Sequence, residues 1–277
     1  MSRIQKTILL ILCIMINFTN ESTAQKFELV WDESFNYSGK PDPAKWNYET
    51  GYIRNQEHQY YTKRKKNVRV KDGKLIITAR KEAYKNKAFD KDSTNWRHNK
   101  EIAEYTSGSI NTFKKFHIQY GKIEVRAKLP KGNGIWAAIW MMSIDLETLG
   151  WPNAGEIDIM EYVGKEPNTI HSTVHYPWEN FLGYASKGGK IDLENLTEDF
   201  HTYTIVWDAE KIDFMVDSNS YFSFNLAEIS EENHPFRRPF YLIINLALGG
   251  NWPGKIDKSI FPQEFIIDYV KVYKKVD

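Results

Sequence analysis

Residues 121–129 read Gly121-Lys122-Ile123-Glu124-Val125-Arg126-Ala127-Lys128-Leu129, a run in which apolar and polar side chains alternate one by one. Successive side chains of a β-strand point to opposite faces, so this alternation predicts a strand with one buried face. The same pattern recurs at 74–79, 201–207 and 211–216, whereas long stretches of helical periodicity are absent. Many short strands separated by turns predict an all-β sandwich or jelly roll.

The first 24 residues are of a different kind. Two basic residues precede an apolar run at 8–16, and small residues stand just before Gln25. The run is shorter than the roughly 20 apolar residues of a membrane-spanning helix, and its order is typical of a secretory signal peptide. We therefore expect cleavage after residues 1–24, a single domain over 25–277, and a secreted protein that acts in the periplasm or outside the cell.

Charge and cysteine content exclude several classes of function. The chain has 37 basic and 36 acidic residues; two and one of these lie in the leader, so the expected mature protein is balanced. A neutral protein gives no reason to expect a nucleic-acid or membrane partner, and it disfavours a heavily sulfated polysaccharide, although a local basic cleft stays open. The only cysteine, Cys13, lies in the leader, so no disulfide or thiol chemistry is expected. We expect a monomer.

Two polar stretches interrupt the strand pattern. Residues 63–66 form a basic cluster, and residues 82–104 are rich in charge of both signs. Neither stretch has the periodicity of a strand or a helix, so we interpret both as solvated loops.

Residues 155–164 hold three acids in the order Gly155-Glu156-Ile157-Asp158-Ile159-Met160-Glu161-Tyr162-Val163-Gly164. Glu156 and Asp158 share one face of a strand, but strict alternation would send Glu161 to the other face. One extra residue between them, a β-bulge, would return Glu161 to the acidic face, and bulges often lie beside active sites.

This spacing predicts a retaining glycosidase. Four strand steps separate the backbones of Glu156 and Glu161 by roughly 13 Å, which two glutamate side chains can close to the separation of about 5 Å found in retaining enzymes. Glu156 would attack the anomeric carbon, and Glu161 would protonate the departing oxygen and then activate water. Asp158 would hydrogen-bond Glu156, and its negative charge would keep Glu161 protonated. An exposed acidic face or a calcium site is the alternative. The 9 Trp, 16 Tyr and 15 Phe favour sugar binding, because sugar faces stack on flat rings.

At this motif the chain resembles glycoside hydrolase family 16, whose signature is E-x-D-x-x-E or the unbulged E-x-D-x-E. The resemblance continues through seven ordered blocks, at residues 31–35, 55–62, 105–108, 120–130, 134–142, 245–254 and 268–273. It implies a concanavalin-like β-jelly roll of two stacked, curved antiparallel sheets, with the three acids on the floor of a concave cleft.

Within the family, the bulged motif and the tryptophan block are most similar to those of bacterial laminarinases. The resemblance therefore implies an endo-acting enzyme that hydrolyses β-1,3-glucan by double displacement. By motif match, Trp136 and Trp140 would line the cleft near the cleaved sugar, Asn55 would hydrogen-bond a sugar on the non-reducing side, and His175 would stand near the acid/base. Trp252 would rim the cleft or cap the core. Plain core packing is the alternative for Trp136 and Trp140.

Some features leave the substrate open. Many laminarinases have Arg where Ser109 stands, so the specificity could extend to mixed-linkage β-1,3-1,4-glucan or to a galactan. A transglycosylase of the same family is a further alternative. A non-catalytic glucan-binding lectin, the alternative from another class, would usually have lost one of the three acids.

Catalysis of this type needs no cofactor, but a structural metal is implied by the resemblance. Glu33, Gly73 and Asp268 match positions that bind calcium in many relatives, and hard oxygen ligands suit that ion; surface hydrogen bonding is the alternative. His171 and His175 share a strand face, but without a third ligand a zinc site is disfavoured.

Overall fold

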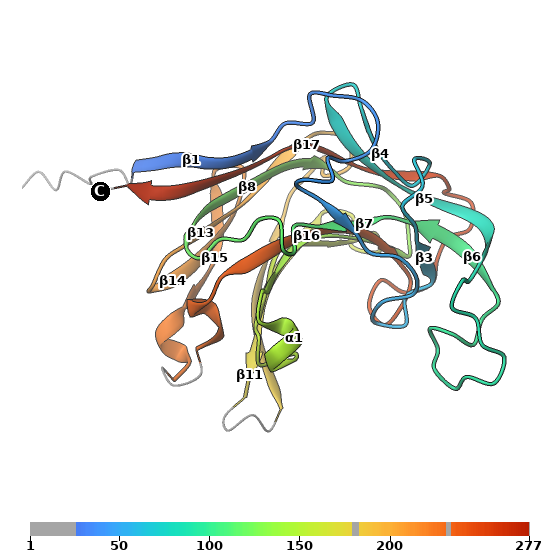
Figure 1. Ribbon diagram of the computed structural model, residues 1–277. Coiled ribbons are helices and arrows are strands. Elements are labelled where there is room, and N and C mark those ends of the chain that lie inside the picture. Colours follow the sequence, from blue (N-terminus) through green and yellow to red (C-terminus); the bar gives the residue numbers. More distant parts are fainter. Residues whose placement is uncertain (1–25, 179–182, 231–233, 277) are drawn as a thin grey trace, which may run out of the picture.

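The computed structural model describes residues 26–178, 183–230 and 234–276. The expected signal peptide lies outside the described residues. Two β-sheets are stacked on one another, the larger above and the smaller below in Figure 1. The expected all-β jelly roll is confirmed. Within the described part of the chain, no helix is long and apolar enough to cross a membrane.

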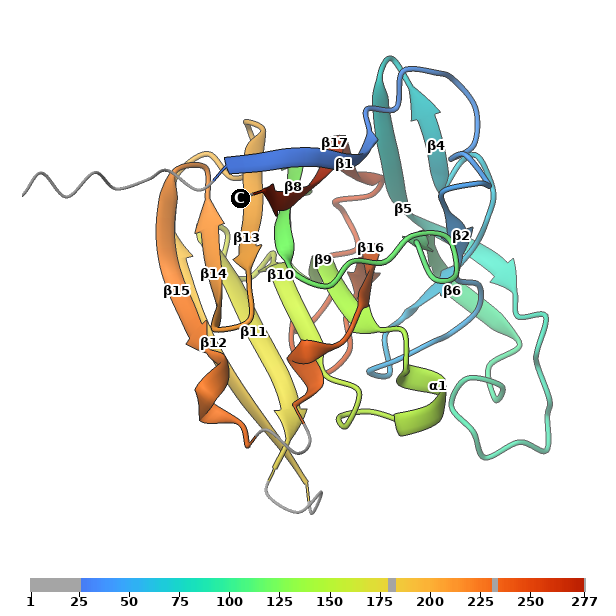
Figure 2. The ribbon, with the colours of Figure 1, turned by 60° about the vertical axis from the view of Figure 1, so that its left-hand side comes forward.

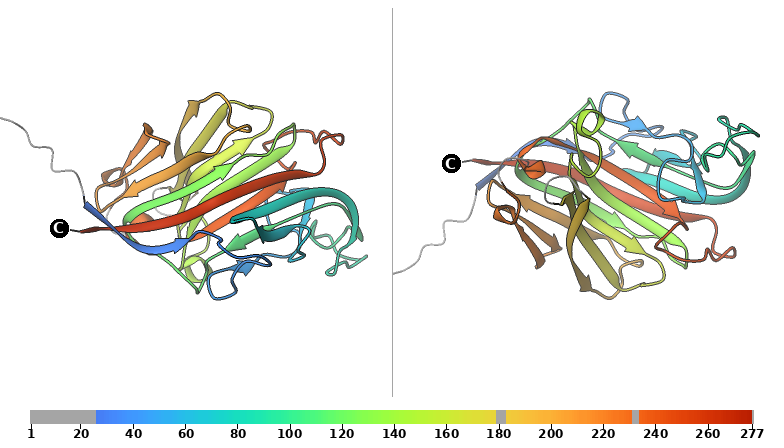
Figure 3. Two further views of the ribbon diagram at one scale, coloured as in Figure 1. Left: turned by 90° about the horizontal axis from the view of Figure 1, so that it is seen from above. Right: turned by 90° about the horizontal axis from the view of Figure 1, so that it is seen from below.

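The larger sheet has the order β15-β14-β13-β8-β17-β5-β6-β3, with β1 paired to β17 and β4 to β5. Among the pairings of the described strands in this sheet, only β3–β6 is parallel. The view from above in Figure 3 shows β17 crossing this sheet from end to end. Its strands are β1 (Lys26–Glu33), β3 (Gln59–Tyr61), β4 (Val68–Lys71), β5 (Lys74–Lys85), β6 (Ile102–Ser107), β8 (Gly121–Lys128), β13 (His201–Trp207), β14 (Lys211–Val216), β15 (Asn219–Asn225) and β17 (Gln263–Val276).

The smaller sheet is antiparallel throughout and has the order β12-β11-β10-β9-β16-β7-β2, which Figure 2 shows from the side. The short helix α1 (Leu146–Leu149) interrupts the connection from β9 to β10, and the 3-10 turns η2 (Leu226–Glu228) and η4 (Pro235–Arg237) precede β16 in the described part of the chain. Its strands are β2 (Asn47–Tyr48), β7 (Ser109–Asn111), β9 (Ile135–Ser143), β10 (Glu156–Val163), β11 (Thr169–Pro177), β12 (Tyr184–Asp192) and β16 (Phe240–Leu248).

One large apolar core fills the space between the sheets. In β8 the buried side chains are those of Ile123, Val125 and Ala127, as the alternation predicted. The face of the smaller sheet that points away from this core carries a second apolar layer, so every residue of β16 is buried. This second layer consists of Ala138, Trp140, Met142, Tyr241 and Ile243.

The charged stretch at 82–104 is only partly a loop. Residues 82–85 continue β5 and residues 102–104 begin β6, so the irregular segment is 86–101. The strand pairing between β5 and β6 supplies backbone hydrogen bonds that charged side chains do not disturb, because alternate side chains point to solvent.

Candidate active site

The bulge that the sequence predicted is present in β10. Asp158 pairs with Trp140 of β9, and Met160 pairs with the next residue of β9, so Ile159 is the extra residue. The register toward β11 shifts in the same segment. Ile159 and Met160 are 1% and 0% exposed, and both lie in the core between the sheets. Two consecutive side chains therefore point inward, which is the local effect of a bulge.

After the bulge, Glu161 lies on the same face as the other acids. It pairs with Ala138 of β9, which pairs with Asn245 of β16, while Asp158 and Trp140 form the neighbouring row. Directly paired residues of antiparallel strands share a face. The expected return of Glu161 to the acidic face is confirmed.

The surroundings of Glu161 favour its protonated form. Burial raises its pKa well above the usual range, and the negative charge carried by the neighbouring Glu156–Asp158 pair raises the pKa further. Nε1 of Trp136 donates to Oε1 of Glu161 at 3.1 Å, a contact that lowers the pKa but does not outweigh the burial. A carboxyl group in this state can give a proton to a departing oxygen near neutral pH.

The pKa of Asp158 is raised because this residue is buried beside Glu156. Burial, the charge of Glu156 and the hydrogen bond that Asp158 donates to Glu156 all raise the pKa of Asp158 well above its usual range. The sequence predicts an ionised Asp158. The structure favours a protonated one, because a second charge beside Glu156 in a buried site is unfavourable.

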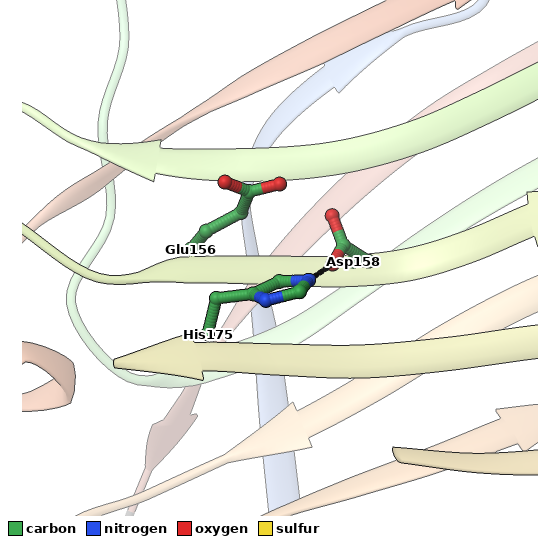
Figure 4. A group of neighbouring side chains, drawn as sticks. All are labelled: Glu156, Asp158 and His175. Carbon is green, nitrogen blue, oxygen red and sulfur yellow. Dashed lines mark ion pairs between the residues drawn. The ribbon is translucent and has the colours of Figure 1, made fainter. Parts of the chain in front are cut away.

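Figure 4 shows His175, from β11, beside Asp158, with its Nε2 atom 3.2 Å from Oδ2. Ligand atoms of Glu156, Asp158 and His175 lie within 4.8 Å of one another, so geometry alone would allow a metal ion. A protonated Asp158 is a poor ligand for a cation. His171 has a different neighbour, with its Nε2 atom 2.9 Å from Oε2 of Glu166.

Trp151 is a site residue that the sequence reasoning missed. It lies between α1 and β10, is 46% exposed, and donates from Nε1 to Oε2 of Glu156 at 2.7 Å. Its ring lies 5.0 Å from that of Tyr184 and 6.1 Å from that of His175. The only signal in the sequence was its place five residues before the first acid, in a segment without periodicity.

Two of the predicted cleft tryptophans stand together. Trp136 is half-buried and meets Trp252 edge to face, with ring centroids 5.5 Å apart. Trp252 in turn lies 5.0 Å from the ring of His171. Because Trp136 also contacts Glu161, this aromatic wall borders the proposed acid/base.

Trp140 occupies a different position from the one expected of a stacking platform. It is 7% exposed, its Nε1 donates to Oδ1 of Asn245 at 2.7 Å, and the guanidinium carbon of Arg54 lies 4.9 Å from its ring centroid. Arg54 also pairs with Glu49 through both carboxylate oxygens, and Ser109 donates to Glu49 at 2.5 Å. A guanidinium group therefore lies near Ser109, where many laminarinases have an arginine.

Asn55 lies on an exposed turn directly after Arg54, with φ of 55°. Its Nδ2 donates to Oε1 of the buried Glu57 at 3.4 Å. Glu57 also accepts from Gln59 and Tyr61. A Cβ on Gly250 would lie 2.9 Å from the carbonyl oxygen of Asn55, so this glycine allows the two loops to pack closely.

The three predicted calcium residues lie far from the acids in the fold, around β1, the β4–β5 turn and β17. Glu33 is buried and accepts from the backbone N–H of Phe35 at 3.0 Å. The carboxylate oxygens of Asp268 pair with Lys74 at 2.9 Å and Arg126 at 2.5 Å. Two cations on this carboxylate do not fit Asp268 as a calcium ligand through its side chain.

Comparisons with known proteins extend over nearly the whole chain. The sequence profile of glycosyl hydrolases family 16 matches residues 55–271. A β-glucanase of Rhodothermus marinus is 42% identical over 281 residues, covering 97% of this chain and 92% of the relative. The solved laminarinase from Rhodothermus marinus is 41% identical with a TM-score of 0.80, covering 91% of this chain and 99% of that one. A structure from work on endo-acting O-glycanases, expressed by human gut microbiota to initiate mucin breakdown, is 41% identical with a TM-score of 0.85, covering 90% and 91%.

Proposed function

This chain belongs to glycosyl hydrolase family 16, and from that membership and the acids of β10 we propose that it is a retaining, endo-acting hydrolase of β-1,3-glucan. The observation that carries the proposal is the bulge, which brings Glu161 to the face of Glu156 and Asp158. The similarity to a β-glucanase and a laminarinase supports the choice of substrate.

The proposed reaction is a double displacement. The carboxylate of Glu156 attacks the anomeric carbon, while Glu161, whose pKa is raised, gives its proton to the departing glycosidic oxygen. The hydrogen bonds from Asp158 and Trp151 orient Glu156 and disperse its charge. In the second step, the ionised Glu161 takes a proton from water, which attacks the anomeric carbon and releases Glu156. Configuration is retained because two inversions occur.

The direct test uses the Glu156→Gln variant. We expect wild-type protein to release oligosaccharides from laminarin with the β-configuration, seen by proton NMR at early times, and the variant to lose at least about a thousandfold of this rate while keeping its thermal unfolding temperature. Hydrolysis by Glu156→Gln at the wild-type rate would exclude the mechanism. Sizing the products separates the alternatives: products longer than the substrate indicate a transglycosylase, and sugar binding without cleavage indicates a lectin.

A second candidate substrate is a mucin-type O-glycan. It is favoured by the similarity to a structure from work on endo-acting O-glycanases. Parallel incubations with laminarin, lichenan, agarose and mucin O-glycans distinguish the two candidates. Faster cleavage of the O-glycans than of laminarin would identify an O-glycan, and not β-glucan, as the substrate.

Three further properties are proposals. We propose export after cleavage near Gln25, which N-terminal sequencing of the secreted protein tests, and a monomeric state, which light scattering tests. A structural calcium near Glu33 and Gly73 is supported by the buried carboxylate of Glu33 and by the left-handed turn at Gly73, with φ of 70°. Added calcium would then raise the unfolding temperature, and a chelator would lower it; no change with either would exclude the ion.

A further inference from the structure

A second concave site lies beside β3, at one end of the larger sheet. Its volume is about 550 Å³, within the range of small-ligand sites. Its lining consists of residues 50–52, 60–64, 84, 86–88 and 97–98. None of these residues belongs to β9, β10 or β11. Figure 1 shows the loop formed by the 86–101 segment below β6.

The lining of this β3 pocket is strongly basic. It includes Lys63, Arg64, Lys87, Arg97 and His98, but no aspartate or glutamate. Arg64 is compensated by a neighbouring acid outside the lining, at 2.6 Å. Lys63 and Lys87 are exposed, and among the described residues neither has a carboxylate oxygen within 4.0 Å. The mature chain is otherwise balanced, so this charge is local and attracts anions.

The segment that covers the pocket is held in place by polar contacts. Asn86 is 1% exposed, and its amide donates to the carbonyl oxygens of Arg97 and Lys100 at 2.9 and 3.0 Å. The guanidinium of Arg97 donates twice to the carbonyl oxygen of Ile53, at 2.9 and 2.6 Å. The residue after Ile53 is Arg54, which covers Trp140 in the cleft. The contacts of Arg97 thus connect the pocket to the chain segment that carries Arg54.

Tyrosine rings supply the apolar part of the pocket. The ring centroids of Tyr52 and Tyr60 are 5.5 Å apart, and those of Tyr60 and Tyr84 are 5.2 Å apart. Aromatic rings beside cations suit a sugar that carries a negative group. The carbon atoms of the sugar can contact the edges of the tyrosine rings while its anionic group meets the lysine ammonium groups.

We propose that the β3 pocket binds an anionic sugar, with its sulfate ester or carboxylate between Lys63 and Lys87. The site goes beyond the proposed hydrolysis, since binding there requires none of the acids of β10. A sparsely charged glycan could be held here while a neutral stretch of the same chain occupies the cleft. This agrees with an overall charge that disfavours a densely sulfated polymer.

The test measures binding of three sugars to the whole mature protein by NMR titration: glucose 6-sulfate, glucuronate and glucose. We expect saturable binding of at least one anionic sugar, weakened by added NaCl, and no saturable binding of glucose at this site. The double variant Lys63→Ala/Lys87→Ala should weaken binding by about fivefold to tenfold. Glucose 6-sulfate and glucuronate distinguish a sulfate from a carboxylate preference.

The matched control is Lys65→Ala/Lys91→Ala, which removes the same charge from two exposed lysines outside the pocket lining. It should bind like the wild type, and both double variants should hydrolyse laminarin within about twofold of the wild-type rate. Equal binding by all three proteins, or an equal loss in both double variants, would overturn the proposal. A wild type that binds the anionic sugar but cleaves no glucan would refute the proposed function alone.

Discussion

Deleting Ile159 should leave β10 in register with both of its neighbours. Toward β9, Asp158 pairs with Trp140, Met160 with Ile139 and Glu161 with Ala138, so without Ile159 the pairing becomes continuous. Toward β11, Asp158 and Glu161 pair with residues two apart, and removal of one residue makes that pairing regular too. Glu161 therefore stays on the cleft face, as in the unbulged form of the motif.

The deletion removes one fully buried isoleucine side chain from the core. A lost isoleucine side chain lowers the free energy of unfolding by about 3 kcal/mol, which corresponds to roughly 6 to 12 °C in the unfolding temperature of a protein of this size. Deleting Ile157 removes an equally buried side chain but moves Glu156 to the core-facing position opposite Met141. The two deletions are thus matched in size and opposite in their effect on the acids.

The assay combines thermal unfolding by circular dichroism with the release of reducing ends from laminarin. We expect the Ile159 deletion to keep at least about 1% of the wild-type rate. A hundredfold loss of rate corresponds to about 2.7 kcal/mol of lost transition-state stabilisation. The Ile157 deletion should be inactive and less stable, because a carboxylate would be buried in the core. A folded Ile159 deletion that is as inactive as Glu161→Gln would refute the register argument.

Three other variants test the surroundings of the acids. Glu161→Gln should abolish hydrolysis yet unfold at or above the wild-type temperature at pH 8. The pKa of Glu161 is raised in the folded state, so this carboxyl stabilises the fold fully only below its unfolded-state pKa. That stabilisation is lost as the pH rises through the folded-state pKa. The gap should close toward pH 4. Trp151→Phe should lower kcat/KM about tenfold by removing one charge-assisted hydrogen bond, whereas Trp178→Phe, an exposed tryptophan without that bond, should not. Arg54→Ala should lower the free energy of unfolding by about 2–4 kcal/mol, and adding Glu49→Gln should recover part of it, as chemical denaturation would show.

The fold could be predicted from the sequence where a strand has one solvent-exposed face and one buried face. β8, β13 and β14 have the expected positions because their apolar side chains alternate with polar ones. β12 was not predicted, since most of its side chains are exposed and it is held by backbone pairing with β11. Pairing between backbones leaves little trace in side-chain periodicity.

The acids of the site could be predicted because all three lie on one strand. The bulge follows from their spacing alone, without knowledge of the neighbouring strands. By contrast, the contact of Arg54 with Trp140 joins distant segments, and the bond from Trp151 to Glu156 depends on the path of an irregular connection. Such contacts are set by tertiary packing, which a local pattern does not encode.

The double burial of β16 has a dynamic consequence. Its backbone pairs with β9 from Phe240 to Leu248 and with β7 at residues 243–245, and neither of its faces is exposed to water along its length. Hydrogen exchange there requires an opening as large as global unfolding, so deuterium should enter β16 last of all the strands. β16 thus forms a slowly exchanging strand in the sheet that carries the acids, so the surrounding loops can differ in sequence while the sheet keeps its shape.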